Sequence, residues 1–409
     1  MGDGGALQGV RVLDLSGEFG QFCGRLMGDH GADVIKIEPP EGDHVRRLGP
    51  FYEDVEDIDR SLYWHAMNTS KRSVTLNLEM EKGRDLLHRL LASTDIVVES
   101  YQPGTLARWG LDFETLHAPY LSLIMASITP FGQTGPYSDY RATETETLAL
   151  GGFMSVCGDP DRSPTRVGQP QATVFSSINA YTGAMLAYYH CLRGGEGQHV
   201  DASMQEGATN LHYAQLIWNG YGIVSPRMGT TLVFGRAAIP ISFACKDGYV
   251  QAIPALGWDA FIPWIHEHGM AGDLMSEEWQ ERLENLVTDW TQEQVDYAHD
   301  IVGQFLSNFT KKELYEEAIR RRQMLYPVQT VQDAREDRQL RERDYFVEVD
   351  VPALDCTLTY PGAPYRMSAT PWRIDRPAPR LGEHNAAIYG DMLGLSEAEL
   401  ALLRQEGVI

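Results

Sequence analysis

The sequence has few cysteines, and their spacing does not suit a disulfide framework or a metal site. Its 409 residues include five cysteines, none of them in a C-x-x-C pair. Secreted proteins stabilised by disulfides, and zinc-binding modules, show closely spaced cysteines instead. The five are Cys23, Cys157, Cys191, Cys245 and Cys356. We therefore expect free thiols in a cytoplasmic protein.

Basic residues and long apolar stretches are also scarce. Lys and Arg number 34 against 57 Asp and Glu, which gives a formal net charge of -23. This excess of negative charge argues against binding to nucleic acid or to an anionic membrane surface. No apolar run approaches the roughly 20 residues that a membrane-spanning helix requires, and residues 1–5 do not resemble a signal peptide. We expect no nucleic-acid partner and no membrane partner.

Several common catalytic motifs are missing. The sequence contains no P-loop, no H-E-x-x-H and no G-x-S-x-G. Gly17, Gly20 and Gly24 are spaced G-x-x-G-x-x-x-G, which differs from the G-x-G-x-x-G of dinucleotide-binding proteins. The 12 histidines show no spacing typical of metal ligands. The sequence therefore predicts no metal site and no permanently bound cofactor.

Short apolar segments alternate with helical segments in the first half of the chain. Strands are predicted at residues 10–15, 31–37, 74–78, 95–99, 121–127 and 198–204. Helices are predicted at residues 20–30, 81–93 and 175–192. This order of strands and helices is typical of a parallel α/β domain.

The pattern changes in the second half. Residues 241–250 predict a hairpin with an Asp247-Gly248 turn. Charge-rich helical segments follow over 258–322, and a terminal helix is predicted at 395–406. A second, smaller α+β domain is expected at about 226–328.

Six segments in a fixed order carry the strongest signal. They read G-A-D-V-I-K-I-E-P-P-E-G-D, N-T-S-K-R-S-V-T-L-N-L, D-I-V-V-E-S-Y-Q-P-G, F-G-Q-T-G-P-Y, G-E-G-Q-H-V-D and C-K-D-G-Y. Their positions are 31–43, 68–78, 95–104, 131–137, 195–201 and 245–249. Each segment alone is weak, but six in one order are specific. Together they resemble the family III CoA-transferases, which are also known as the CaiB/BaiF or formyl-CoA transferase type.

The resemblance covers essentially the whole chain and implies both a fold and a reaction. The implied fold has a large Rossmann-like α/β domain built from both chain ends, a small α+β domain in the middle, and two interlinked subunits. The implied divisions are 1–225 and 329–409 for the large domain and 226–328 for the small one. Family members pass CoA from an acyl-CoA to a carboxylic acid through an aspartate that takes up the acyl group. A coenzyme A thioester is therefore the expected substrate.

At the position that the resemblance assigns to this aspartate, the chain has an asparagine. Residues 178–183 read I-N-A-Y-T-G, and Asn179 takes the place of the aspartate in D-x-x-[ST]-G. An uncharged amide is a poor nucleophile. The only acidic residue between Asp161 and Asp201 is Glu196, which lies in the turn after the predicted helix. We therefore expect no competent catalytic residue in this chain.

Other family positions are partly retained and partly changed. Leu76, Tyr101 and Arg108 match positions that contact CoA in the family. The positions that depart from the family pattern are Pro39, Glu79, Ser100 and Gln102. Because these changes surround one ligand, they indicate a relaxed demand for CoA binding and catalysis.

Two hypotheses follow, together with two further alternatives. The first is a non-catalytic subunit of a heteromeric CoA-transferase, whose homologous partner has the aspartate. Succinyl-CoA is then the expected donor, and benzylsuccinate is a candidate acceptor, as in the anaerobic degradation of aromatic compounds. The second is a self-sufficient enzyme that processes acyl-CoA through another carboxylate, such as Glu144 or Asp139. An inactive regulatory protein and an engineered Asp→Asn variant are the further alternatives.

Overall fold

The structure is a computed structural model that describes residues 4–224, 226–234, 237–254, 257–283 and 290–409. The chain divides into two compact units, and both chain ends belong to unit 1. Unit 1 holds the chain up to Met154, Arg166–Ile223 and Gln339–Ile409, and unit 2 holds Ser155–Thr165 and Val224–Arg338. The domain boundaries predicted from the sequence stay a prediction, and residue 225 lies outside the described residues.

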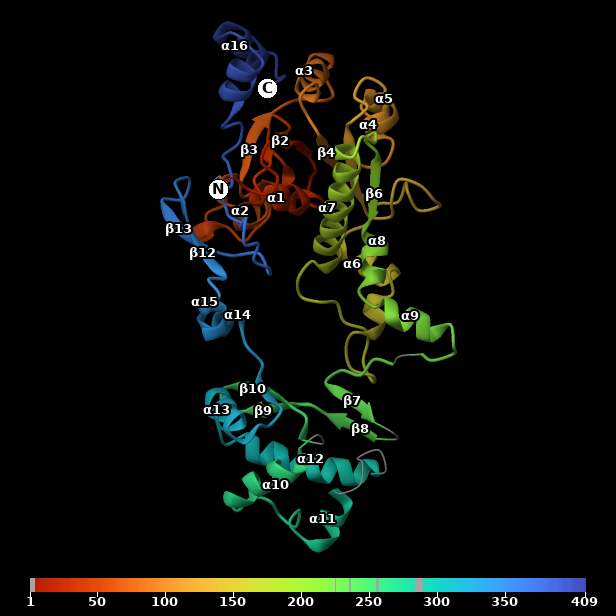
Figure 1. Cartoon of the computed structure of the whole chain (residues 1–409), viewed down its shortest axis with the longest axis vertical. Coiled ribbons are helices and arrows are strands. Elements are labelled where there is room, and N and C mark those ends of the chain that lie inside the picture. Colours follow the sequence, from red (N-terminus) through yellow and green to blue (C-terminus); the bar gives the residue numbers. More distant parts are fainter. Residues whose placement is uncertain (1–3, 225, 235–236, 255–256, 284–289) are drawn as a thin grey trace. The chain divides into compact units, whose positions relative to one another are not determined.

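Unit 1 contains most of the strands and helices (Figure 1). Its strands are β1 Arg11–Leu15, β2 Asp33–Glu38, β3 Lys71–Thr75, β4 Ile96–Glu99, β5 Ile124–Thr129, β6 His199–Ser203, β12 Phe346–Val351 and β13 Cys356–Pro361. The α-helices that lie entirely within it are α1 Gln21–Asp29, α2 Leu62–Met67, α3 Glu81–Leu91, α4 Thr105–Trp109, α5 Phe113–His117, α6 Glu144–Leu150, α7 Gln171–Leu192, α8 Met204–Asn210, α9 Tyr213–Asn219 and α16 Glu397–Gln405. The remaining short helical segments are η1 His44–Arg47, η2 Tyr52–Asp54, η3 Phe153–Val156, α15 Arg338–Glu342 and η6 Ala386–Met392, of which η3 and α15 extend across a unit boundary.

The centre of unit 1 is a six-stranded sheet in the order β3-β2-β1-β4-β5-β6. All neighbouring strands are parallel, for example with Leu13 opposite Ile35 and Val97. Parallel neighbours require crossover connections, which α1 and α3 provide between β1 and β2 and between β3 and β4. The order reverses between β1 and β4, as in doubly wound nucleotide-binding domains.

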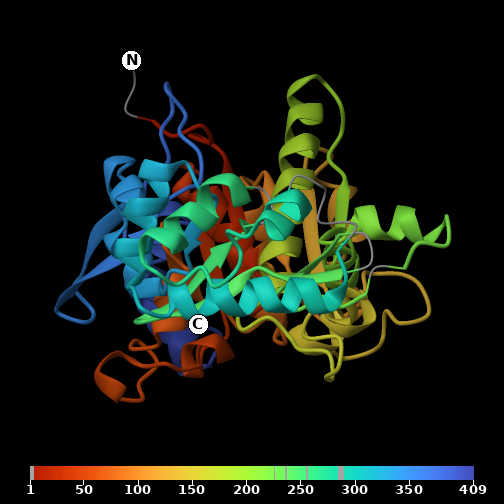
Figure 2. The same ribbon diagram turned by 90° about the horizontal axis from the view of Figure 1, so that it is seen from below.

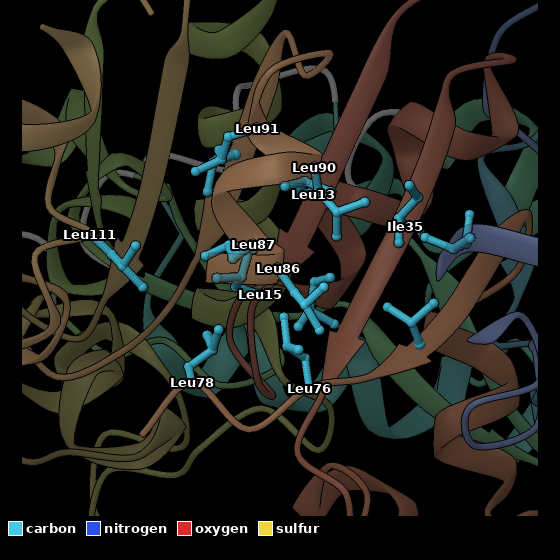
Figure 3. Packing of buried hydrophobic residues seen from close by; sticks show 14 of the residues in the cluster. Leu13, Leu15, Ile35, Leu76, Leu78, Leu86, Leu87, Leu90, Leu91 and Leu111 are labelled. Atoms are coloured by element: carbon cyan, nitrogen blue, oxygen red, sulfur yellow. The ribbon is translucent and has the colours of Figure 1, made fainter. Parts of the chain in front are cut away.

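Both faces of this sheet are apolar, as expected for a parallel sheet that helices cover on both sides. One face packs against leucines of α3 and against the C-terminal segment, including Tyr389 and Ile409 (Figure 3). The other face packs against α1 and against the alanines Ala180, Ala184 and Ala187 of α7. These small residues let the long helix α7 lie close to the sheet.

Unit 2 has smaller sheets and a helical layer. Its elements are β7 Thr231–Phe234, β8 Ala237–Pro240, β9 Ser242–Cys245, β10 Gly248–Ala252, β11 Leu325–Pro327, α10 Trp258–Glu267, α11 Glu277–Leu283, α12 Gln292–Leu306, α13 Lys311–Arg321 and α14 Val331–Glu336. Strands β11-β10-β9 form one antiparallel sheet, and β7-β8 form another. Trp258, Phe261 and Phe305 belong to its core, and α12 is the long teal helix in the foreground of Figure 2.

The predicted α/β class is confirmed, and the hairpin around Asp247 is present as β9 and β10. The strand predicted at 74–78 is wrong in position, because β3 spans Lys71–Thr75. Apolar alternation predicted the later range, whereas the actual strand begins with a fully buried lysine that a distant carboxylate neutralises. Among the described residues, no helix combines the length and apolar character needed to cross a bilayer.

Candidate functional site

A pocket of about 640 Å³ lies at the carboxyl edge of the parallel sheet. Residues that follow β1, β2, β3 and β4 line it, among them Gly17, Pro39, Leu76 and Tyr101. In doubly wound sheets the loops diverge where the strand order reverses and leave a crevice for a ligand. Here the order reverses between the neighbouring strands β1 and β4. Residues that follow both of these strands line the pocket, so the pocket lies at the point of reversal.

A buried network of charges supports the loops that form the pocket. The Lys71 ammonium lies 2.7 Å from an Asp14 carboxylate oxygen, and Lys36 lies 3.8 Å from Asp14 and 3.4 Å from Asp43. Burial alone raises the pKa of Asp14, but the charges of Lys71 and Lys36 hold it below its usual value. A Cβ at Gly24 would lie 2.3 Å from Oδ2 of Asp14, the oxygen that Lys71 binds, so this close packing requires glycine.

A second buried cation fixes the loop after β2. Arg46 donates to both carboxylate oxygens of Glu38 at 2.6 and 2.9 Å and to Asp59 at 2.9 Å. Its guanidinium also lies 3.6 Å from the centroid of the Trp64 ring. Ion pairs of this kind hold a loop in one position, because breaking them would leave a buried charge without a partner.

The rim of the pocket is rich in carboxylates. Glu18, Glu41 and Glu79 line it together with the cations His44 and Arg47. Hydrogen bonds to Asp43, and then to Glu18, raise the pKa of His44 to about 9. His44 is therefore positively charged at neutral pH and partly offsets the acidic rim.

The first turn of α7 lies beside this region and binds a carboxylate of the same chain. Glu144 accepts hydrogen bonds from the backbone N–H groups of Gln171 at 2.6 Å, Ala172 at 2.7 Å and Thr173 at 2.9 Å. The Thr173 hydroxyl donates a fourth bond at 2.8 Å. Free N–H groups at a helix start attract anions, so each Glu144 oxygen accepts two hydrogen bonds here.

One hydrogen bond connects α7 with the pocket. The Ser177 hydroxyl donates to the carbonyl of Phe19, a pocket residue, at 2.9 Å. Burial raises the pKa of Tyr63 to about 12, with smaller contributions from the negative charges of Glu18 and Glu144.

Residues 7–385 match the family description CoA-transferase family III. The chain belongs to CoA-transferase family III. Members of this family transfer CoA between an acyl-CoA and a carboxylate, so acyl-CoA is the substrate class that the family implies.

Relatives of the family III chain extend over nearly its whole length. It is 31% identical over 388 residues to the succinyl-CoA:(R)-benzylsuccinate CoA-transferase subunit BbsE of Thauera aromatica, with 92% of each chain covered. It is 34% identical over 423 residues to the succinyl-CoA–D-citramalate CoA-transferase of Chloroflexus aurantiacus, with 98% of each covered. A CAIB/BAIF family protein from Brucella suis has a similar structure, with a TM-score of 0.81, 27% identity and coverage of 95% and 100%.

The structure brings together two of the three residues predicted to contact CoA in this family III chain. Leu76 and Tyr101 both line the pocket. Arg108 does not: it lies exposed on α4 and donates to the Thr105 hydroxyl at 3.1 Å. The changed positions Pro39, Glu79, Ser100 and Gln102 line the pocket as well.

Asn179 lies half-buried on α7, two residues after Ser177. Residues two apart on a helix point to nearly opposite sides. Thr173 and Ser177, four residues apart, share the buried face that contacts Glu144 and Phe19. The structure therefore turns Asn179 away from this face, and its correspondence to the family aspartate stays a prediction.

Sequence patterns did not identify the charged residues beneath the pocket. Lys36 and Lys71 belong to the segments 31–43 and 68–78 that carried the family resemblance, but their burial and their pairing with Asp14 were not predicted. Glu144 was considered as an alternative carboxylate, but its position against α7 was not predicted. Asp139, the other alternative, lies exposed in a loop. Among the described residues, no cluster of His, Cys, Asp and Glu is suited to hold a metal ion.

Proposed function

We propose that this chain is the non-catalytic subunit of a heteromeric family III CoA-transferase. A homologous partner chain has the aspartate that takes up the acyl group, and this chain completes and stabilises the complex. The proposed donor is succinyl-CoA, and the proposed acceptor is a carboxylic acid, with benzylsuccinate as the first candidate. Two relatives are named as subunits, BbsE and the beta subunit of a succinyl-CoA–L-malate CoA-transferase of Chloroflexus aurantiacus, which supports a heteromer.

The composition of α7 carries the proposal. The resemblance places the catalytic aspartate on this helix, yet none of its 22 residues is Asp or Glu. A catalytic carboxylate is therefore missing from α7 whether Asn179 or another residue of this helix corresponds to the aspartate. Covalent transfer through a carboxylate needs an ionised carboxyl group at that place.

The self-sufficient alternative would require another carboxylate in this region, and Glu144 is the best placed. Its two oxygens already accept four hydrogen bonds from α7. An attacking oxygen needs a free lone pair and an open approach, and these bonds occupy both oxygens. The geometry therefore favours a structural role for Glu144.

The charge of the pocket rim also supports reduced CoA binding. Glu18, Glu41 and Glu79 line the opening, and His44 and Arg47 are the cationic side chains among its lining residues. The phosphate groups of CoA carry several negative charges, which these carboxylates repel. Glu79 lies where the family pattern has a lysine, so one position changes an attraction into a repulsion.

Exposed apolar side chains on two helices, α7 and α9, support a protein partner and the proposed interlinked dimer. Leu186 and Tyr189 on α7 are 67% and 60% exposed, and Trp218 on α9 and Tyr221 after it are 48% and 84% exposed. Helix α7 has no Asp, Glu, Lys or Arg, and α9 has no buried residue. Contiguous apolar surfaces on folded proteins commonly mark interfaces.

The first test is the activity of the purified chain alone. CoA transfer from succinyl-CoA to benzylsuccinate is measured by chromatography of the CoA esters. We expect no turnover by this chain and turnover after co-expression with a homologous chain that has the aspartate. Turnover by the lone chain would refute the proposal.

A second test asks whether a single carboxylate restores activity. Asn179→Asp and Thr173→Asp are compared, because position 179 follows from the sequence pattern and position 173 faces the pocket side of α7. We expect no transfer by either variant, since the pocket rim is altered as well. Activity of Asn179→Asp alone would support the engineered-variant alternative, and activity of Thr173→Asp would contradict the loss of a competent pocket.

A further inference from the structure

A second cavity of unit 1, with a volume of about 890 Å³, lies beside the hairpin of β12 and β13 (Figure 1). Its lining residues come from two segments, 340–347 and 362–372. Among the described residues, none lines both this cavity and the pocket at the carboxyl edge of the sheet. The cavity is therefore separate from the candidate site and independent of the proposed function.

Backbone and side-chain contacts hold the two walls of this cavity in place. The N–H of Gly362 donates to the Tyr345 carbonyl at 2.7 Å and so joins one wall to the other. A Cβ at Gly362 would lie 2.7 Å from that carbonyl oxygen and 3.4 Å from the Trp372 ring, so glycine allows this close approach. The Tyr365 hydroxyl is hydrogen-bonded at 2.6 Å to Nε2 of His30, which is 3% exposed at the end of α1. The cavity is therefore preformed, as small-molecule sites usually are.

Apolar and aromatic side chains provide most of the lining. They include Tyr345, Tyr365, Trp372, Val347, Pro364 and Met367. Walls of this kind contact the apolar part of a ligand, and aromatic rings pack well against another ring, either offset or edge-on. The lining therefore favours a ligand that has an aromatic body.

Three charged side chains, Arg343, Asp344 and Arg366, also line the cavity. The Arg366 guanidinium lies 3.2 Å from Oδ2 of Asp344, so these two charges offset each other. Arg343 is exposed, and within the described parts of the chain its guanidinium has no ion-pair or hydrogen-bond partner. The lining thus has a net positive charge, although the chain has a formal net charge of -23.

A guanidinium without a partner beside aromatic walls suits a carboxylic acid. Guanidinium binds carboxylate through two parallel N–H···O bonds, and these charge-assisted bonds are stronger than bonds between neutral groups. One carboxylate needs one such group, which Arg343 provides. A ligand with several phosphate groups suits the cavity less, because Asp344 lies beside the second guanidinium.

We propose that the cavity lined by residues 340–347 and 362–372 is a binding site for a small carboxylic acid with an aromatic body. Arg343 binds the carboxylate, and the rings of Tyr345 and Trp372 contact the aromatic part. Asp344 competes with the ligand for Arg366 and weakens the binding.

Isothermal titration calorimetry of the full chain with phenylacetate at neutral pH tests the proposal. Phenylethanol has the ring without the carboxylate, and acetate has the carboxylate without the ring. We expect saturable binding of phenylacetate and binding weaker by about tenfold or more for each of the other two compounds.

Two variants change the charge of the cavity in opposite directions. Arg343→Gln should weaken the binding of phenylacetate by about tenfold, because the carboxylate loses its charged donor. Asp344→Asn should strengthen it by about two- to fivefold, because Arg366 then has no competing carboxylate. Asparagine tolerates the φ of +49° at position 344 as aspartate does. The control Arg404→Gln removes an exposed cation of α16 and should leave the affinity unchanged.

Both charge variants alter exposed side chains, so we expect them to fold. The proposal would be overturned if the wild type showed no saturable binding of phenylacetate, or if Arg343→Gln and Asp344→Asn left its affinity unchanged. Sedimentation gives a further check. A wild-type dimer that Trp372→Ala dissociates would also overturn the proposal, because a second copy of the chain would then fill the cavity.

Discussion

The substitution Glu99→Gln should make unit 1 more stable at alkaline pH, although it removes a hydrogen-bonded carboxylate. The pKa of Glu99 rises from 4.5 in a solvated chain to about 7 in the fold. The folded state therefore binds the proton more tightly than the unfolded state does. This contribution to stability is fully present below pH 4.5 and is lost as the pH rises through 7. Glutamine resembles the protonated form of Glu99 at every pH, so the variant keeps this contribution to stability as the pH rises.

The structure sets the size of the effect. Each pKa unit corresponds to about 1.4 kcal/mol, so the displacement of the Glu99 pKa from 4.5 to about 7 corresponds to about 3 kcal/mol. Solvent screening reduces this value little, because Glu99 is only 2% exposed. We expect Glu99→Gln and the wild type to have similar free energies of unfolding near pH 4.5. By pH 8 the variant should be more stable by up to about 3 kcal/mol.

Urea unfolding at several pH values between 4.5 and 8.5 measures this difference. Because the chain has two compact units, the transition of unit 1 is assigned by hydrogen exchange of β4 and β5. Glu79→Gln is the control, since it removes an exposed carboxylate from the rim of the same pocket. A wild-type curve that runs parallel to that of Glu99→Gln across this range would refute the reasoning.

Three further outcomes are expected. Glu144→Ala should lower the free energy of unfolding by about 1–2 kcal/mol, because α7 loses the acceptor of its first N–H groups, and added formate should restore part of the loss in thermal unfolding. Arg46→Ala should lower the free energy of unfolding in urea by about 3–5 kcal/mol, because Glu38 stays buried without its partner. The control Arg47→Ala removes an exposed neighbour and should change this free energy by less than about 0.5 kcal/mol. The wild type should lose stability as the pH rises from 6.5 through about 9, because the pKa of His44 is raised only in the folded state. His44→Gln should not show this loss. Equal profiles of unfolding free energy against pH for the two proteins would contradict this.

Much of the fold could be predicted from local patterns. The apolar runs of β1, β2 and β4 predicted buried parallel strands. Such runs arise because helices cover both faces of a parallel sheet, as they do here. The start of β3 was not predictable in this way. Lys71 is a polar residue in a local pattern, and only Asp14, 57 positions earlier, makes its burial possible.

In the candidate site, too, residue types could be predicted from the sequence, whereas the orientation of side chains could not. The pattern of six segments located Leu76 and Tyr101, which the fold brings into one pocket. It also drew attention to Asn179, because the residue type is visible in the sequence. The direction in which a helix turns a residue depends on what the helix packs against. For α7 this is the sheet and the loop of Phe19.

By itself the sequence determined the family, the class of fold and the absence of a carboxylate along α7. These properties depend on residue types and on their order in the chain. Only the tertiary structure decided that Glu144 fills the start of α7 and that Glu99 is buried beside the backbone N–H of Tyr101. The partners of Glu144 come from a distant segment, and burial changes the protonation of Glu99 in a way that no local pattern records.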